Sequence, residues 1–170
     1  METHGKITKQ DIIAIIPARY SSERLPGKLL LEAGGRPIIA HTLDAVRRSR
    51  SISRVIVAVD NAELYSAVQK AGGEAMMTSS GHASGSDRIA EIAACIEGDQ
   101  IIVNVQGDEP MITRNVIDSA IDALLSDPSA DIATTCEPRS DAAAVLNPYV
   151  VKVVADAEGN ALYFSRAPVP

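Results

Sequence analysis

The sequence has no tryptophan and one phenylalanine among its 170 residues, and aromatic side chains make up 3% of it. Bases of single-stranded nucleic acid stack on aromatic side chains, so few stacking platforms are available. The formal net charge of −6 also argues against a nucleic-acid partner, because such binding needs basic surface that neutralises phosphates. We therefore expect no nucleic-acid binding.

Long apolar runs and cysteines are also scarce. No apolar run approaches the ~20 residues of a membrane-spanning helix, and residues 1–10 lack the apolar centre and cleavage pattern of a secretory signal. Cys95 and Cys136 have no ligand or redox spacing, which fits a reducing compartment. We therefore expect a cytoplasmic protein without membrane contact, with a flexible leader over 1–10 and one domain over 11–170.

The most informative stretch is Ile12–Leu30. It begins with an unbroken apolar run over 12–16, short enough for a strand buried on both faces. Pro17 is expected to end that strand, because proline cannot donate to the ladder. The polar loop that follows carries three cations and one acid, which are Arg19, Arg24, Lys28 and Glu23.

A buried strand that leads into a cationic loop is the usual layout of an anion site in an open α/β sheet, where ligands lie beyond the carboxyl ends of strands. The alternative is a set of solvated charges beside an ordinary strand. The loop has one glycine, Gly27, and Ser22 and Leu29 stand where a P-loop needs Gly and Ser or Thr. Any phosphate would therefore be held mainly by side-chain cations.

The rest of the chain alternates strand and helix patterns up to residue 135. After a turn at Gly34-Gly35, we expect strands over 55–59, 74–77, 101–105 and 132–135, and helices over about 37–50, 62–71, 86–96 and 113–125. Asp60-Asn61 is expected to cap the second helix. This alternation is typical of a doubly wound, mostly parallel α/β sheet. The strand patterns 150–154 and 161–164 predict a C-terminal β-hairpin that would make the sheet mixed.

Several motifs together resemble one known family. Pro17-Ala18-Arg19, followed by RLPGK over 24–28, resembles the signature loop of the sugar-acid cytidylyltransferases. The RLPGK form is similar to the 3-deoxy-D-manno-octulosonate (Kdo) cytidylyltransferase, or CMP-Kdo synthetase, family in particular. The stretches 105–111 (VQGDEPM) and 161–166 (ALYFSR) resemble the same family in the same order. The resemblance covers nearly the whole chain and implies a Rossmann-type fold of the nucleotide-diphospho-sugar-transferase kind.

The resemblance also implies an activity. It implies an enzyme, a nucleotidyltransferase that uses CTP, Kdo and Mg²⁺ to form CMP-Kdo and pyrophosphate for lipopolysaccharide biosynthesis, with a homodimer as the full-length assembly. The alternatives are a sister cytidylyltransferase for another 2-keto sugar acid and an inactive CTP-binding fragment. Because the family continues well beyond the ALYFSR motif, we expect this chain to be truncated at its C-terminus. It would then hold the nucleotide part and only the start of the sugar-acid part, and turn over little.

For the triphosphate, the resemblance implies contacts from Ala18, Arg19 and Lys28, with Lys28 near the α-phosphate. Arg24 would assist them or form a salt bridge within the loop. Asp108 follows a buried strand, where a carboxylate can reach Mg²⁺ held between protein and phosphates; the alternative is a plain polar turn. The expected catalytic residues are Arg19, Lys28 and Asp108, because cytidylyl transfer needs positioning and charge neutralisation more than a covalent nucleophile.

For the base and the sugar acid, the resemblance implies four further residues. Ser86 and Arg88 lie in an element similar to the one that reads cytosine, whose O2 and N3 accept hydrogen bonds. The alternative for Ser86 is a helix N-cap. Gln106 would reach the sugar acid, and Arg166 would pair bidentately with its carboxylate. Without the resemblance, Arg166 would be interpreted as a solvated charge at a strand edge.

Overall fold

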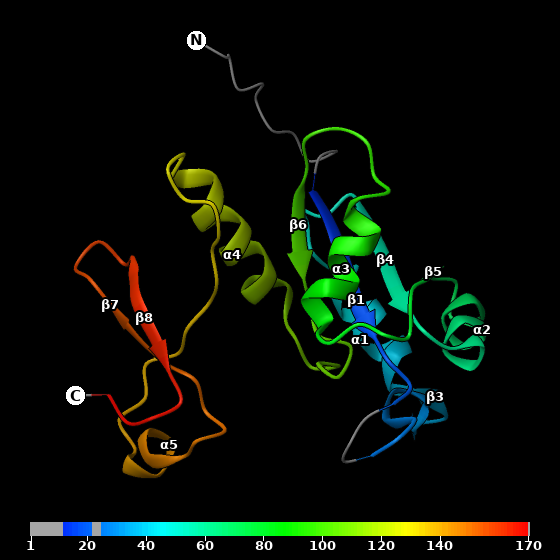
Figure 1. The fold of residues 1–170 in the computed structure, drawn as a ribbon, viewed down its shortest axis with the longest axis horizontal. Coiled ribbons are helices and arrows are strands. Elements are labelled where there is room, and N and C mark those ends of the chain that lie inside the picture. Colours follow the sequence, from blue (N-terminus) through cyan, green and yellow to red (C-terminus); the bar gives the residue numbers. More distant parts are fainter. Residues whose placement is uncertain (1–11, 22–24, 170) are drawn as a thin grey trace. The chain divides into compact units, whose positions relative to one another are not determined.

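The computed structural model describes residues 12–21 and 25–169 (Figure 1). The expected leader over 1–10 and the candidate Arg24 lie outside the described residues. The chain divides into two compact units, one up to Ala133 and one from Thr134 onward. The single domain expected over 11–170 stays a prediction.

Four parallel strands form the sheet of the first unit, in the order β5-β4-β1-β6. Every residue of β1 is buried, as expected for a central strand of a parallel sheet covered on both faces. The strand order confirms the predicted doubly wound parallel sheet. The bounds of the strands are β1 Ile12–Ala18, β4 Arg54–Val59, β5 Glu74–Met77 and β6 Ile101–Asn104.

Strand β1 continues past Pro17, so the predicted end at this proline is wrong. Pro17 and Ala18 still pair with β4. The carbonyl of Ile15 accepts the N–H of Val105, so the backbone of Ile15 faces β6, and the backbone of Pro17, two residues further, faces the same side. Pairing with β6 has already ended there. The missing N–H of proline therefore costs no hydrogen bond of the ladder.

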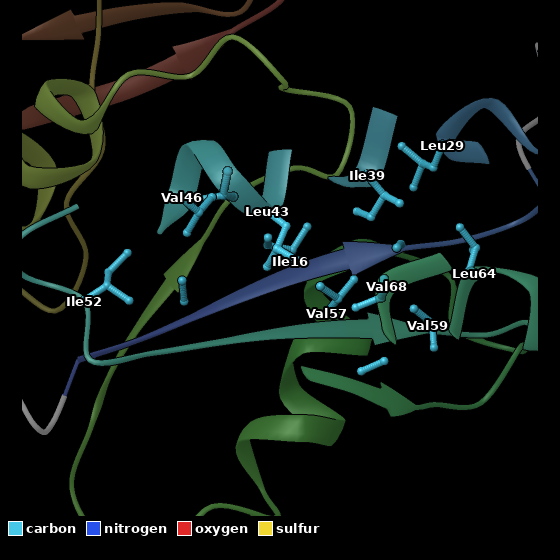
Figure 2. Packing of buried hydrophobic residues seen from close by; sticks show 14 of the residues in the cluster. Ile16, Leu29, Ile39, Leu43, Val46, Ile52, Val57, Val59, Leu64 and Val68 are labelled. Carbon is cyan, nitrogen blue, oxygen red and sulfur yellow. The ribbon is translucent and has the colours of Figure 1, made fainter. Parts of the chain in front are cut away.

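Helices cover both faces of the sheet. Helices α1 (Ile38–Val46), α2 (Ala62–Lys70) and α4 (Arg114–Ser126) pack with the even-numbered residues of β1. Figure 2 shows this packing around Ile16. Helix α3 (Gly85–Ala93) packs against the odd-numbered residues on the other face. Each fully buried Ile or Leu here contributes about 1.5–3 kcal/mol of hydrophobic free energy, so the helices hold the strands in register.

Helices α1 and α3 differ at their ends from the sequence-based expectation, and α3 ends at Ala93 instead of near 96. Helix α1 ends at Val46 instead of near 50. The chain turns at Ser49, whose hydroxyl accepts the N–H groups of Ser51 and Ile52 and so competes with the helical pattern. Helix α3 begins at Gly85 and is capped by Ser84, which forms a capping box with the third residue of the helix. The alternative that made Ser86 the N-cap is therefore wrong.

Between β1 and α1 the chain forms three short elements. The 3₁₀ helix η2 (Lys28–Leu30) follows Gly27, whose φ of 69° lies in the left-handed region that favours glycine. Gly27 also donates its N–H to the carbonyl of Tyr20 at 2.9 Å, so this loop closes on itself. Strands β2 (Glu32–Ala33) and β3 (Arg36–Pro37) then form a small antiparallel hairpin around the predicted glycine turn.

The second unit contains helix α5 (Ala142–Leu146) and the predicted hairpin, formed by β7 (Lys152–Ala155) and β8 (Ala161–Ser165). Within the described residues the hairpin is a two-stranded sheet of its own, and its expected place in a mixed sheet stays a prediction. In an antiparallel hairpin the N–H and C=O groups that face each other bond across the two strands, so these groups need no third strand.

The predicted strand over 132–135 is also wrong, because this segment pairs with no strand among the residues described here. Its β-branched composition favours an extended chain, but a strand needs a partner for its N–H and C=O groups. In the described parts of both units, no helix has the length and apolar character needed to cross a membrane.

Candidate functional site

The candidate residues of the first unit follow the carboxyl ends of three strands. Strand β1 leads into the loop 19–28, termed here the cation loop, of which residues 22–24 are not described. Strand β5 leads into the loop 78–84, and β6 leads into the loop 105–112. In the sheet β4 lies between β5 and β1, and β6 lies on the other side of β1 (Figure 1). Because these strands are parallel, their carboxyl ends lie at one edge of the sheet. Ligands of open α/β sheets bind at this edge.

Lys28 and Asp108 form an ion pair at this edge, although they lie 80 residues apart in the sequence. The distance between Lys28 Nζ and Asp108 Oδ2 is 2.5 Å, and the side chains are 36% and 48% exposed. The hydrogen bond from Lys28 lowers the pKa of Asp108, against the opposing effect of partial burial. Asp108 is therefore a carboxylate at neutral pH, in reach of solvent and beside a cation.

An ionised carboxylate in this position fits one particular kind of metal binding. Mg²⁺ is usually held by one or two carboxylates together with substrate phosphates and water, not by a cage of protein ligands. In the part of the chain that the structure describes, no group of three His, Cys, Asp or Glu side chains could hold a metal ion. Asp108 thus fits a cation that arrives with a polyphosphate.

Gly107 allows the loop of Asp108 to lie close to β1 and η2. A Cβ atom at Gly107 would lie 3.0 Å from the carbonyl oxygen of Pro17 and 3.1 Å from Cδ1 of Leu29. The hydroxyl of Thr42 on α1 donates to the carbonyl of Gly107 at 2.8 Å in the buried interior. This close approach is what places Asp108 next to Lys28.

Arg19 and Ala18 continue this edge at the end of β1. Arg19 is exposed in the cation loop, where its guanidinium is accessible to an anion. Ala18 is fully buried in the core, so its side chain offers no contact to a ligand. A contact from Ala18 would have to use its backbone.

Ser86 and Gln106 lie near each other on the far side of β1. Ser86 is exposed in the first turn of α3, and Gln106 is exposed after β6. A Cβ atom on Gly85, the neighbour of Ser86, would lie 3.9 Å from Oε1 of Gln106. The Gln106 amide donates to Oδ1 of Asn104 at 3.0 Å, which orients its oxygen. The start of α3, which carries Ser86, and Gln106 therefore lie at one corner of the edge.

Arg88 differs from the other candidates because its side chain is only 3% exposed. It donates to Oδ2 of Asp60 at 3.0 Å, to Oγ1 of Thr78 and to the carbonyl oxygen of Ser79 at 3.2 Å. A buried guanidinium needs such partners, since an uncompensated buried charge is costly. Its predicted contact with the base is not tested by these bonds and stays a prediction.

Asp60 was missed by the sequence interpretation, which placed Asp60-Asn61 as a helix cap. Only Asn61 caps α2 in the described structure, accepting the N–H groups of Glu63 and Leu64. Asp60 instead accepts from Arg88 and from the backbone N–H of Tyr20. Its place directly after β4, at the carboxyl edge, is the signal that could have identified it.

In the second unit, Arg166 is fixed by backbone carbonyls. Its guanidinium donates to the carbonyls of Pro148 and Tyr149 at 3.1 and 3.5 Å. Its own carbonyl accepts from the ammonium of Lys152 at 2.5 Å. The Lys152 side chain runs into the unit and also donates to the carbonyls of Asn147 and Val150. Arg166 is therefore exposed but held, and its contact with a sugar acid stays a prediction.

Comparison of the sequence with known proteins gives a consistent result. Residues 13–170 match the family described as Cytidylyltransferase. The chain is 48% identical over 162 residues to the 3-deoxy-manno-octulosonate cytidylyltransferase of Chromohalobacter salexigens, covering 94% of this chain and 63% of that protein. It is 50% identical over 158 residues to the enzyme of the same name from Hahella chejuensis, covering 92% and 62%. The chain thus spans 62–63% of the length of these relatives.

Solved structures show the same similarity. The structure of a CMP:2-keto-3-deoxy-manno-octonic acid synthetase complexed with CTP has a TM-score of 0.89 at 42% identity, covering 94% of this chain and 65% of that one. A cytidylyltransferase from Leptospira borgpetersenii has a TM-score of 0.61 at 25% identity, covering 70% and 50%. The predicted α/β fold and the family resemblance are confirmed.

Proposed function

The chain belongs to the cytidylyltransferase family, and from this membership we propose that it carries the nucleotide-binding part of an enzyme that transfers the cytidylyl group of CTP to Kdo. The solved structure with a TM-score of 0.89 is of a synthetase complexed with CTP. Because this chain spans 63% of its relative from Chromohalobacter salexigens, the activity of the whole protein is part of the proposal.

The observation that carries the proposal is the ion pair between Lys28 and Asp108 at the carboxyl edge. It brings together the cation expected on the triphosphate and the carboxylate expected on the metal, from two motifs 80 residues apart. In transfer of a nucleotidyl group, positioning and neutralisation of charge do most of the work. Nucleotidyl transfer needs at least a cation for the phosphate charge and a carboxylate for the metal ion, and Lys28 and Asp108 supply both side by side.

The proposed reaction breaks one bond and forms one. The sugar hydroxyl attacks the α-phosphorus of CTP and loses its proton to solvent, while the bond from that phosphorus to the bridging oxygen of the β-phosphate breaks and pyrophosphate leaves. Lys28 and Arg19 stabilise the negative charge that builds on the phosphate oxygens. Asp108 holds the cation, which, when bound, neutralises the triphosphate further.

The remaining roles follow from position. Ser86 and Arg88 serve the base, directly or through the loop that they adjoin, and Gln106 orients the acceptor from the same corner. Arg166 pairs with the carboxylate of the sugar acid, for which a planar guanidinium is well suited. Arg24 would add a further cation to the triphosphate site. We propose a homodimer as the working assembly.

The proposed setting is the cytoplasm, with lipopolysaccharide biosynthesis as the use of the product. The two cysteines, Cys95 and Cys136, are free and exposed, which fits a reducing compartment. Many relatives of the chain are named 3-deoxy-manno-octulosonate cytidylyltransferases, which favours Kdo over another 2-keto sugar acid as the acceptor.

One assay separates the candidate functions. Release of pyrophosphate from CTP is measured with Mg²⁺ and with Kdo or a second 2-keto sugar acid in parallel, and binding of CTP is measured by titration. Pyrophosphate release with Kdo supports the proposal, and release only with the other acid supports a sister enzyme. Binding of CTP with no release from either acid supports the alternative of a nucleotide-binding chain without turnover, whereas absence of CTP binding contradicts all three.

A further inference from the structure

Asp60 joins two loops of the carboxyl edge through one buried carboxylate. Its side chain is 8% exposed. Oδ1 accepts the backbone N–H of Tyr20 in the cation loop at 2.9 Å, and Oδ2 accepts from Arg88 on α3 at 3.0 Å. Hydrogen bonds to a charged acceptor in a buried setting are among the stronger ones in proteins. The position of the cation loop therefore depends on a group that is also bound to α3.

Arg88 extends this connection to the loop 78–84. Its guanidinium donates to the hydroxyl of Thr78 and to the carbonyl of Ser79, the first two residues of that loop. Thr78 is itself buried and donates its hydroxyl to the carbonyl of Val59 at the end of β4. Asp60 is thus connected to the loop 78–84 through the guanidinium of Arg88.

Residues of helix α3 make three further contacts with the same loop. The carboxylate of Glu91 accepts the N–H of Ser79 at 3.0 Å and contacts Nε2 of His82. At the end of the loop, the hydroxyl of Ser84 accepts the N–H of Asp87 in the capping box. The loop 78–84 is therefore fixed at its start, middle and end by residues of one helix. A shift of Arg88 would move its first residues relative to the rest.

We propose that Asp60 is a positioning residue that couples the cation loop to the loop 78–84, so that triphosphate binding and base discrimination depend on one buried carboxylate. The inference rests on the proposed function, since it takes CTP as the ligand of both loops. Arg88 influences the choice of base through its hold on Thr78 and Ser79. Asp60 can couple the two loops in this way without contacting the nucleotide.

The direct test is Asp60→Asn. The amide oxygen of asparagine still accepts from the N–H of Tyr20, but its NH₂ group faces the guanidinium of Arg88 and cannot accept from it. Dissociation constants are measured for CTP and UTP with Mg²⁺, and amide hydrogen exchange is measured on the free protein. We expect CTP binding to weaken about tenfold or more and the preference for CTP over UTP to fall, with faster exchange in the loop 78–84.

The matched control is Glu74→Gln. It also removes a carboxylate that pairs with an arginine, Arg54, but at the amino end of β5. We expect both dissociation constants and the exchange of the loop 78–84 to stay as in the wild type. Urea unfolding of both variants measures any loss of stability, whereas a change in the CTP/UTP ratio is expected only for Asp60→Asn.

A second variant keeps the inference testable if Asp60→Asn does not fold. In Arg88→Lys the charge opposite Asp60 is kept, but a single ammonium cannot bridge Asp60, Thr78 and Ser79 as the guanidinium does. We expect a reduced CTP/UTP ratio with the Tyr20 amide still protected from exchange. A wild-type ratio in either folded variant overturns the inference. Wild-type protein that does not prefer CTP overturns the proposed function instead, and the exchange data on the free protein then still decide whether Asp60 couples the loops.

Discussion

Lys28 is the residue on which the proposed chemistry depends most. In Lys28→Ala we expect the free energy of unfolding to change by less than about 1 kcal/mol, because a half-exposed ion pair contributes little. In a complete enzyme that carries the same change, turnover of CTP should fall about 10²-fold or more, the usual effect of losing one preorganised donor aimed at developing charge.

The measurements for Lys28→Ala are urea unfolding, CTP titration and pyrophosphate release. Lys70→Ala serves as the control, because Lys70 is an exposed cation on α2. Near-normal CTP binding and turnover in Lys28→Ala would remove Lys28 from the mechanism. An equal loss in Lys70→Ala would point to a general effect of net charge.

The residue types in the motifs predicted which side chains are candidates for function better than they predicted which side chains contact each other. Lys28 and Asp108 were both assigned from their motifs, but their contact could not be predicted, because it depends on how Gly107 packs against Pro17. The burial of Arg88 could not be predicted either, since an arginine in the first turn of a helix usually lies in solvent. It is buried because Asp60, which follows β4 directly, compensates its charge.

At the scale of elements, Gly107 tests how tightly β6 must join β1. Gly107→Ala places a Cβ at 3.0 Å from the carbonyl oxygen of Pro17, a backbone atom that cannot move without disturbing the end of β1. We expect a loss of about 1–3 kcal/mol in the free energy of unfolding, measured by urea denaturation.

Gly81→Ala is the matched control for Gly107→Ala. A Cβ at Gly81 would meet Oγ of Ser79 at 3.5 Å, an ordinary contact. Its stability should stay within about 0.5 kcal/mol of the wild type. Equal stability of the two glycine variants would show that the approach of the loop 105–112 to β1 is not tight.

The pair of Arg54 and Glu74 links β4 and β5 at their amino ends and gives a dependence of stability on pH. The hydrogen bond from Arg54 lowers the pKa of Glu74 below its ordinary value of 4.5. A carboxyl group whose pKa is lower in the folded state stabilises the fold above its unfolded-state pKa. This contribution is lost as the pH falls from about 4.5 through the lowered pKa.

We therefore expect Glu74→Gln to be less stable than the wild type at pH 7, by up to about 1 kcal/mol because both side chains are partly exposed. The difference should shrink as the pH is lowered below 4.5. Urea unfolding of both proteins at a series of pH values measures it. A difference that grows toward acid pH would contradict the assignment.

The elements that the sequence predicted best are those whose pattern is local. Strand β5 and the start of α2 lie where expected, because their apolar spacing and the cap Asn61 are contained in a few residues. The prediction of a strand over 132–135 was wrong because strand formation depends on a partner outside the segment. The predicted end of β1 was wrong because Pro17 costs no hydrogen bond where pairing with β6 has already ended. That point depends on another strand and cannot be predicted from the residues around Pro17.

At the scale of the whole molecule, the predicted nucleotide residues belong to the first unit and Arg166 belongs to the second. We expect CTP with Mg²⁺ to slow amide exchange in the described part of the cation loop, in the loop 78–84 and in the loop 105–112. Exchange in β7 and β8 should stay unchanged until a sugar acid is added.

Hydrogen exchange followed by mass spectrometry measures this expectation, with cytidine as the control ligand that lacks the triphosphate. Cytidine should protect the loop 78–84 more strongly than the cation loop, which it can affect only through the coupling at Asp60. Protection of β7 and β8 by CTP alone would show that the second unit takes part in nucleotide binding.

The ion pair of Lys28 and Asp108 makes binding of the triphosphate and binding of the cation depend on each other in the proposed site. A triphosphate that draws Lys28 away leaves Asp108 unpaired beside an anion, and a cation that draws Asp108 away leaves Lys28 unpaired beside a positive charge. When both arrive together, each side chain exchanges one partner for another, and no charge is left alone. We therefore expect the two proposed ligands to raise each other's affinity, by the same factor because linkage is reciprocal. A triphosphate or a cation that arrives alone would meet a site whose charge Lys28 and Asp108 already neutralise between themselves.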